Sequence, residues 1–351
     1  MLISGGLLVS GEILMARYEG AVTEADLFGD KAAAAPQPKS DIKGPLNILL
    51  AGIDPRDSEP NWIPRADSVL ILHVSRDLKR GYLFSLPRDL WVDVPRFEKA
   101  NYRGGKDKLA HAMFNGSQVP GQAKPDYARG FELLSKTVSG YTGINRFDAG
   151  AIINFTGFTR IVDAMGGVNM YVDMDVTSIH RQPDGKHRKP SGIRGAEGAA
   201  AYVGPRMEYK KGNHHLNGWQ ALDYVRQRYI PGGDYARQRH QQQFIRAMVG
   251  QALSKSVATN PKKLDSVLRA AGQALVFNGR GHSVVDFGFA LRDLRMDSIV
   301  MLKLPGRSII DNGKYIGEEL ADPTPEFFEA LRSEQLDPFI LAHPQMVNSS
   351  K

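Results

Sequence analysis

Three short apolar runs separated by charged turns stand out in the N-terminal half of the hydropathy pattern. They occupy Leu46–Gly52, Val69–Val74 and Tyr82–Leu86, and each has an arginine or aspartate at or near an end. Uninterrupted apolar runs of this length predict strands that are buried on both faces of a sheet. The charges at their ends are therefore expected to meet at the rim of that sheet, where α/β proteins place their sites.

The rest of the chain alternates between helical and extended patterns. Capping residues, glycine stops and helical spacing predict helices after Lys108, over Tyr127–Ser139, Phe158–Met165 and Pro325–Arg332, from Asn217, from Asp234 towards Leu253, and from Pro261. Further strands are predicted over Phe147–Phe155, Val168–Val176 and Ser298–Leu304. This alternation predicts an α/β fold of the α-β-α sandwich type, with a central mixed sheet flanked by helices.

Composition divides the chain into three parts. Residues 1–44 contain an apolar run interrupted by Glu12 and then a small, polar, proline-containing linker over Phe28–Gly44. The core is predicted to begin at Leu46, with one domain over residues 45–345 and a tail over 346–351. The apolar run is shorter than the roughly 20 residues of a membrane span, and no Lys or Arg precedes it. We interpret it as a remnant of a membrane anchor or, alternatively, as a peripheral helix.

Two charged, glycine-bearing stretches interrupt the regular pattern. Arg88–Val119 is predicted to form a long excursion over the strand ends, and Asp175–Gly212 a mobile insertion. His214 and His215, which follow directly, are interpreted as loop histidines rather than as a metal-binding pair.

The overall composition excludes several classes of protein. Apolar residues make up 42% of the chain and charged residues 24%, which is ordinary for a soluble domain. The net charge of +7 is mostly dispersed, so it suits an anionic ligand without indicating nucleic acid. The chain has no cysteine, which excludes disulfides, Cys–zinc sites and thiol catalysis. It also has no P-loop, no G-x-S-x-G elbow and no H-E-x-x-H motif.

The helix predicted from Asp234 carries a charge on its core-facing side. At 100° per residue, Arg237 and Gln241 fall on one arc with the apolar Phe244 and Met248, whereas Arg239 points to the opposite side. A buried arginine must meet a counter-charge or an anionic ligand. We therefore expect Arg237→Ala to abolish function and Arg239→Ala to be nearly silent.

If these charges converge, arginines outnumber the acids. Arg226 and Arg228 project to one side of an extended segment, and they join Arg56, Arg65, Arg88 and Arg237 against Asp54, Asp67 and Asp89. Arginine forks suit phosphate oxygens, and aspartates beside phosphates commonly hold Mg²⁺. The alternative is that each arginine is solvated or ion-paired and that the aspartates cap turns.

Eight motifs, in order, resemble the LytR–CpsA–Psr (LCP) family. They are NILLAGID, RADS, SLPRD, KLAHA, INFTGF, VDAMGGV, HHLNGWQALDYVRQR and DYARQRHQQ, within Leu46–Leu253. The resemblance implies a membrane-anchored enzyme on the extracytoplasmic face of a bacterial membrane. Such enzymes transfer a glycopolymer (arabinogalactan, teichoic acid or capsule) from a polyprenyl-pyrophosphate carrier onto peptidoglycan, or in some lineages onto protein.

The same resemblance implies roles for individual residues. The ion, Mg²⁺ or alternatively Mn²⁺, is expected at Asp54 and Asp67, and catalysis at Arg88, Asp89 and Arg237, with Asp89 as a candidate base. Pyrophosphate is expected at Arg65, Arg88, Lys108, Arg226, Arg228, Arg237 and Gln241, and Arg56 is a weaker match. An apolar channel for the lipid is also expected, and Phe155, Phe158, Ile161 and Val162 are candidates to line it. The alternative is that these four side chains are ordinary core residues. The chain departs from the family pattern at His240, where an arginine is common, and in reading KLA for a KIN-like motif.

Three other functions are compatible with these residues. One is a non-catalytic protein that binds or senses polyprenyl pyrophosphate, and another is a polyprenyl-pyrophosphate pyrophosphatase. The third, a nucleic-acid-binding regulator, is prompted by the pI of about 9.4 but lacks any helix-turn-helix or aromatic-basic pattern. We therefore expect no nucleic-acid partner.

Overall fold

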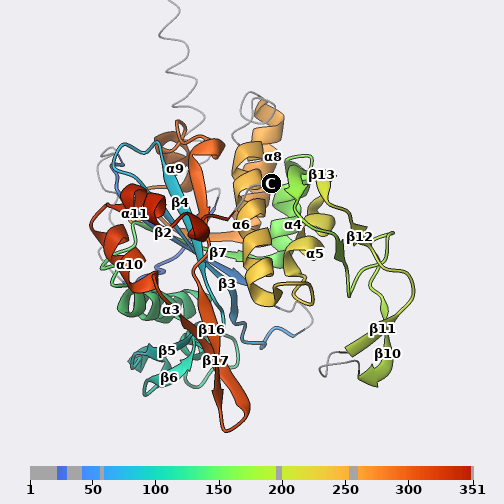
Figure 1. The fold of residues 1–351 in the computed structure, drawn as a ribbon, viewed down its shortest axis with the longest axis horizontal. Helices are drawn as coiled ribbons and strands as arrows, with labels where there is room; N and C mark the ends of the chain where they lie inside the picture. Colours follow the sequence, from blue (N-terminus) through green and yellow to red (C-terminus); the bar gives the residue numbers. More distant parts are fainter. Residues whose placement is uncertain (1–21, 30–41, 56–58, 195–199, 253–259, 349–351) are drawn as a thin grey trace, which may run out of the picture.

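A mixed β-sheet lies at the centre of the molecule, with helices on both sides (Figure 1). The structure is a computed structural model that describes residues 22–29, 42–55, 59–194, 200–252 and 260–348. Within these residues, seven strands pair in the order β1-β14-β7-β2-β3-β4-β15. Their bounds are Thr23–Glu24 (β1), Leu46–Ile53 (β2), Ala66–Val74 (β3), Gly81–Leu86 (β4), Ala149–Asn154 (β7), Leu275–Asn278 (β14) and Ile299–Leu302 (β15).

The sheet contains both parallel and antiparallel pairs. The pairs β1/β14, β2/β7 and β4/β15 are parallel, whereas β7/β14, β2/β3 and β3/β4 are antiparallel. The three strands predicted at Leu46, Val69 and Tyr82 are all present and adjacent. The prediction of a central mixed sheet is confirmed.

Alternating side chains of β2 reach two different cores. Leu49, Ala51 and Ile53 join the core beneath α2 (Leu109–Ser117), α3 (Tyr127–Thr142) and α10 (Thr324–Arg332). Leu46 and Ile48 face the opposite layer, which includes α9 (Val284–Ala290). Because successive strand side chains point to opposite faces, both faces of β2 are buried. The α-β-α sandwich is confirmed.

A third core lies beside the sheet. It is formed by α4 (Phe155–Ala164), α5 (Gly218–Arg226), α8 (Pro261–Ala274) and β8 (Val168–Val172), with Phe244 from α6 (Gly233–Ala252). Each of these helices occurs where the sequence predicts one. Asn217 begins α5 with the predicted capping box to Gln220, and Gly166 follows α4 with a φ of 80°.

The strand predicted over Val168–Val176 is divided into two parts. β8 pairs with β13 (Gly212–Leu216) outside the central sheet, and β9 (Val176–Thr177) pairs with β12 (Glu208–Tyr209). His214 and His215 therefore lie on a strand, and the interpretation of both as loop histidines is wrong. His215 Nδ1 lies 2.7 Å from Asn169 Oδ1, and His214 Nε2 lies 2.5 Å from the Lys210 carbonyl oxygen.

The core begins earlier than the sequence predicts. Val22, Leu27 and Phe28 are buried, and β1 pairs with β14, so the chain joins the core before Leu46. The N-terminal apolar run and most of the predicted linker lie outside the described residues. Within the part that is described, no helix has the length and apolar character to cross a bilayer.

The charged interruptions also contain regular structure. Arg88–Val119 includes the hairpin β5 (Trp91–Val94) and β6 (Gly105–Lys108), followed by α2 after Lys108 as predicted. The insertion carries the pair β10 (Lys189–Arg194) and β11 (Ala200–Val203). Near the C-terminus lie elements that the sequence pattern did not predict: the hairpin of β16 (Gly306–Asp311) and β17 (Lys314–Leu320), and α11 (Leu336–Ala342).

A buried histidine in the sheet makes stability depend on pH. His73 of β3 is 4% exposed, and its Nδ1 lies 2.9 Å from Asn47 Oδ1. Burial lowers the pKa of His73 from 6.5 to about 4, and attraction to Glu334 offsets this only in part. Between these values the unfolded state binds more protons, so the free energy of unfolding falls as the pH decreases from 6.5 towards 4.

We therefore expect titration of His73 to lower the free energy of unfolding by roughly 2 to 3 kcal/mol between pH 7 and pH 4.5. Urea unfolding of the wild type and of His73→Gln at both pH values measures it. The loss of stability between the two pH values should be smaller in the variant. An equal loss in both proteins contradicts the prediction.

Candidate active site

An irregularity in β3 places the first site residue. The β2/β3 register pairs Gly52 with Ser68 and Ile53 with Ala66, which leaves Asp67 as an extra residue in a bulge. In a regular strand Ala66 and Val69 would face opposite sides of the sheet. Because of the bulge, both side chains lie in the same core. A bulge redirects the side chain that it carries, and here it brings the Asp67 side chain to a cleft at this end of the sheet.

This cleft has a volume of about 400 Å³ and is rich in arginine. Among the described residues, four arginines and one carboxylate line it. Six of the ten predicted site residues therefore meet in one place: Asp67, Arg88, Arg226, Arg228, Arg237 and Gln241. They come from β3, the segment after β4, the end of α5 and the first half of α6, which are far apart in the sequence.

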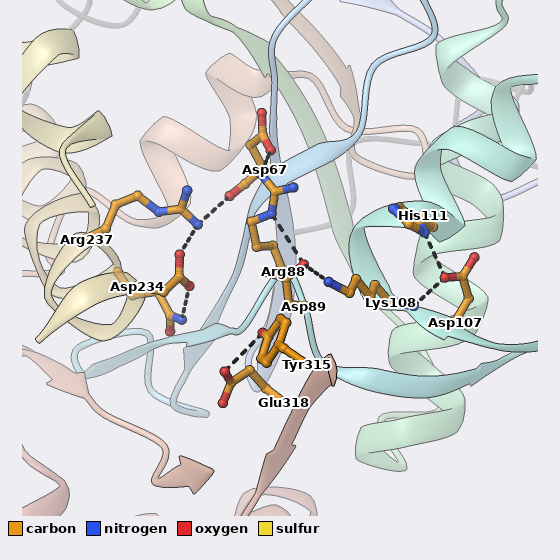
Figure 2. Close-up of polar contacts among 11 residues, drawn as sticks. Asp67, Arg88, Asp89, Asp107, Lys108, His111, Asp234, Arg237, Tyr315 and Glu318 are labelled. Atoms are coloured by element: carbon orange, nitrogen blue, oxygen red, sulfur yellow. Dashed lines mark hydrogen bonds and ion pairs between the residues drawn. The ribbon is translucent and has the colours of Figure 1, made fainter. Parts of the chain in front are cut away.

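Arg237 is the most deeply buried of these arginines. Arg237 is 6% exposed. Its Nη2 donates a hydrogen bond to the Asp67 carbonyl oxygen at 3.3 Å and forms an ion pair with Asp234 Oδ1 at 2.5 Å (Figure 2). Its Nε is buried and finds no hydrogen-bond acceptor among the described residues. Burial lowers the pKa of the Arg237 guanidinium. The negative charges of Asp234 and Asp67 oppose this shift, whereas the positive charges of Arg88 and Arg228 add to it. An anion in the cleft would therefore stabilise this guanidinium.

Arg88 stands between two carboxylates. Its Nη1 donates to Asp67, and its Nε lies 3.8 Å from Asp89 Oδ1 (Figure 2). Asp89 Oδ1 also lies 3.2 Å from Lys108 Nζ. Neither Asp89 nor Lys108 lines the cleft. Asp89 instead contacts Arg88, and Lys108 contacts Asp89.

The hairpin β16/β17 supports Lys108 in turn. Lys108 Nζ lies 4.7 Å from the centre of the Tyr315 ring, and Tyr315 donates its hydroxyl to Glu318 Oε1 at 3.0 Å (Figure 2). The backbone N–H of Glu318 donates to the Asp89 carbonyl oxygen at 2.8 Å. The hairpin β16/β17, which the sequence pattern did not predict, thus helps to hold the Arg-Asp pair after β4.

Arg226 and Arg228 reach the cleft, although the segment is less extended than predicted. Arg226 is the last residue of α5, and the chain becomes extended at Gln227. Arg226 Nη2 donates to Asp54 Oδ2 at 3.1 Å, and its guanidinium lies 4.5 Å from the centre of the Phe155 ring. Arg228 Nη2 lies 3.2 Å from the Tyr229 hydroxyl.

Two predicted arginines are placed differently from the rest. Arg65 is not among the residues that line the cleft, and its guanidinium lies 5.3 Å from the centre of the Phe114 ring. Arg56 lies outside the described residues. No group of three or more His, Cys, Asp or Glu side chains suited to a metal ion occurs in the described part of the chain.

An almost wholly apolar cavity adjoins the cleft. It lies between the sheet and helices α4, α5 and α6, and it shares Ser68, Phe155, Arg226 and Gln241 with the cleft. Of the four predicted channel residues, Phe155 and Phe158 line this cavity. Ile161 and Val162 are instead packed in the third core. The alternative of ordinary core packing is correct for these two.

The face of α6 opposite the cleft is also occupied. Arg239 Nε donates to Asp173 Oδ2 at 2.5 Å, and the fully buried His240 lies 3.0 Å from Asp173 Oδ1. Burial opposes ionisation of Asp173, but its contacts with His240 and Arg239 outweigh this and lower its pKa. The departure from the family pattern at His240 therefore affects the packing of α6 against β8 rather than the cleft.

The insertion contributes cleft residues that the sequence pattern did not indicate. Ile179, His180 and Tyr202 line the cleft, as do Gln227 and Tyr229. Gln227 and Tyr229 lie next to predicted arginines, so their proximity was available from the sequence. The insertion carries no periodicity that could have indicated its three residues.

Comparison with known proteins assigns the chain to a family. The profile of the LytR_cpsA_psr family matches residues 15–331. The cell wall biosynthesis protein LcpA of Corynebacterium glutamicum is 26% identical over 303 residues, which is 84% of this chain and 52% of LcpA. The regulatory protein MsrR of Staphylococcus aureus is 28% identical over 64% of this chain and 55% of MsrR. The chain thus spans about half the length of these relatives.

A further relative and a solved structure complete the comparison. The polyisoprenyl-teichoic acid–peptidoglycan teichoic acid transferase TagU of Enterococcus faecalis is 28% identical over 73% of this chain and 70% of TagU. The structure of TagT bound to LIIa-WTA superposes with a TM-score of 0.58 at 23% identity, covering 85% of this chain and 94% of TagT. This similarity shows a shared fold. The protein belongs to the LytR–CpsA–Psr family.

Proposed function

We propose that this protein transfers a cell-wall glycopolymer from a polyprenyl-pyrophosphate carrier onto peptidoglycan. The observation that carries the proposal is the junction of an arginine-lined cleft with an apolar cavity through shared residues. A polyprenyl pyrophosphate has the same two parts, an anionic head and a hydrocarbon tail. The names of LcpA and TagU, a cell wall biosynthesis protein and a teichoic acid transferase, support this class of substrate.

The reaction is a phosphoryl transfer. A hydroxyl oxygen of the acceptor forms a bond to the sugar-linked phosphorus, and the bond from that phosphorus to the bridging oxygen breaks. The products are a phosphodiester between polymer and peptidoglycan, a polyprenyl phosphate and a proton. Arg88, Arg226 and Arg237 stabilise the negative charge that grows on the leaving phosphate. Arginine's fixed fork of donors suits this task.

Mg²⁺, or Mn²⁺ in its place, is proposed to bind at Asp54 and Asp67. Both carboxylates follow the paired positions Ile53 and Ala66 at one end of β2 and β3, and both contact arginines that line the cleft. Two carboxylates completed by substrate phosphates are a donor set that magnesium commonly accepts, without a full cage of protein ligands. When bound, the ion would neutralise phosphate charge.

The proposal places the cleft at the extracytoplasmic face of the membrane, where carrier and peptidoglycan meet. The direct test incubates the purified protein with lipid-linked polymer, Mg²⁺ and peptidoglycan, followed by mass spectrometry of muropeptides. We expect a polymer–muropeptide phosphodiester. Tight lipid binding without this product identifies a binding or sensing protein. Phosphate release without acceptor identifies a pyrophosphatase.

A substitution in the cavity tests the place of the lipid tail. Ala151 of β7 lines the apolar cavity, so Ala151→Phe places a ring in that space. We expect at least about a tenfold weaker affinity for the long-chain substrate, because excluding two methylenes costs about 1.6 kcal/mol. The matched control is a short-chain analogue on the same variant, which should be unaffected. Equal weakening for both substrates contradicts the assignment.

A further inference from the structure

The insertion places a histidine in the wall of the arginine cleft. His180 lines the cleft together with Arg88 and Arg226, and it is exposed to solvent. Its ring meets the Tyr202 ring edge-on, with centroids 5.0 Å apart. Neither ring nitrogen is hydrogen-bonded within the described part of the chain. Both nitrogens are therefore available to a ligand.

A buried polar network fixes the backbone that carries this ring. Ser178 Oγ donates to Asp223 Oδ1 at 2.9 Å and accepts the backbone N–H of His180 at 3.2 Å. Gln227 Nε2 donates to Asp223 Oδ1 at 2.9 Å, and its Oε1 accepts the backbone N–H of Ile179 at 3.2 Å. The segment before His180 is thus tied to α5, the helix that ends at Arg226.

A second contact fixes the partner ring. Arg188 is 5% exposed, and its guanidinium donates to the carbonyl oxygens of Ile179 at 2.7 Å and Tyr202 at 2.6 Å. The backbone N–H of Arg188 donates to the His180 carbonyl oxygen at 2.8 Å. His180 and Tyr202 are therefore held together at the cleft by buried groups, although they lie in a sequence region without periodicity.

The proposed transfer needs a group that accepts the proton of the acceptor hydroxyl. Three carboxylates contact arginines of the cleft and are paired with them: Asp67 with Arg88, Asp54 with Arg226, and Asp234 with Arg237. Asp89, the base candidate from the sequence, pairs with Lys108 and is absent from the cleft lining. An ion-paired carboxylate is a poor proton acceptor because protonation breaks the pair.

The surroundings of His180 favour its neutral form. Partial desolvation at the wall of the cleft lowers its pKa, and the charges of Arg226, His187, Arg181 and Arg188 act in the same direction. These groups come from α5 and from the insertion, the two parts of the chain that pack around the ring. A neutral imidazole with free nitrogens is a suitable general base near neutral pH.

We propose that His180 is the general base of the transfer reaction. One ring nitrogen accepts the proton from the acceptor hydroxyl while its oxygen bonds to phosphorus and the bond to the polyprenyl phosphate breaks. The resulting imidazolium then releases the proton to solvent. This inference rests on the proposed function and deepens it, because it assigns the acceptor side of the cleft to the insertion.

The test compares His180→Gln with wild-type protein in the transfer assay with lipid-linked polymer and peptidoglycan. We expect kcat to fall by about 10² to 10⁴-fold, the usual contribution of a general base. Affinity for the lipid substrate should change less than about threefold, because the arginines remain in place. The decrease of kcat on the acidic side of the pH profile should disappear. Imidazole should partly restore the activity of His180→Ala.

His214→Gln is the matched control, because His214 lies on β13 and is absent both from the cleft lining and from the groups that shift the pKa of His180. It should retain wild-type kcat. Wild-type kcat in His180→Gln overturns the inference, as does a lower kcat whose acidic limb is unchanged and which imidazole does not restore. Inactive wild-type protein instead contradicts the proposed function itself, so the two failures can be told apart.

Discussion

Arg237→Ala is expected to lower the rate of glycopolymer transfer by about 10² to 10³-fold, the loss typical of removing one preorganised donor to a developing anion. Arg237 lies in the cleft with a buried, unsatisfied Nε among the described residues, so its guanidinium is arranged for a ligand rather than for the protein alone. The measurement is kcat with saturating lipid-linked polymer. Circular dichroism and thermal unfolding check that the variant is folded.

Arg239→Ala is the control on the same helix. Arg239 is absent from the cleft lining, so kcat per folded molecule should stay within about twofold of the wild-type value. This corresponds to a change of less than about 0.5 kcal/mol in the activation free energy. The structure adds an expectation for stability. Loss of the Asp173 contact should lower stability by about 1 to 2 kcal/mol. Equal loss of kcat in the two variants would falsify the orientation of α6 described above.

Asp67→Asn is expected to abolish the Mg²⁺ dependence of transfer and to lower kcat by at least about 10²-fold. The substitution keeps the size of the side chain but removes the charge that contacts Arg88. If Asp67 only screened that arginine, the variant would bind the pyrophosphate group more tightly and remain active. Titration of activity with Mg²⁺ and with EDTA, together with lipid affinity, distinguishes these outcomes.

Asp234→Asn provides the matched control. Asp234 also screens a cleft arginine, Arg237, but it is not one of the two proposed metal ligands. This variant should keep the Mg²⁺ requirement of the wild type, whereas Asp67→Asn loses it. The same Mg²⁺ response in the two variants would remove the basis for a metal at Asp67.

The sequence by itself determined most regular elements and their faces. Buried strands have uninterrupted apolar runs, as at Leu46 and Tyr82, and these signals are local. The same holds for the capping box at Asn217 and for the stripe that begins at Arg237. The resemblance in eight motifs was also local information, and the family profile match over residues 15–331 confirms it. These signals sufficed for the fold class and for six of the cleft residues.

Only the tertiary structure decided how these parts meet. The bulge at Asp67 depends on the β2/β3 register, and the early start of the core depends on pairing between β1 and β14. Two further features join residues that are more than 40 positions apart in the sequence. Tyr315 supports Lys108, and His180 lies in the cleft with Arg88 and Arg226. No periodicity encodes such contacts, because they result from long-range packing rather than from the preferences of neighbouring residues.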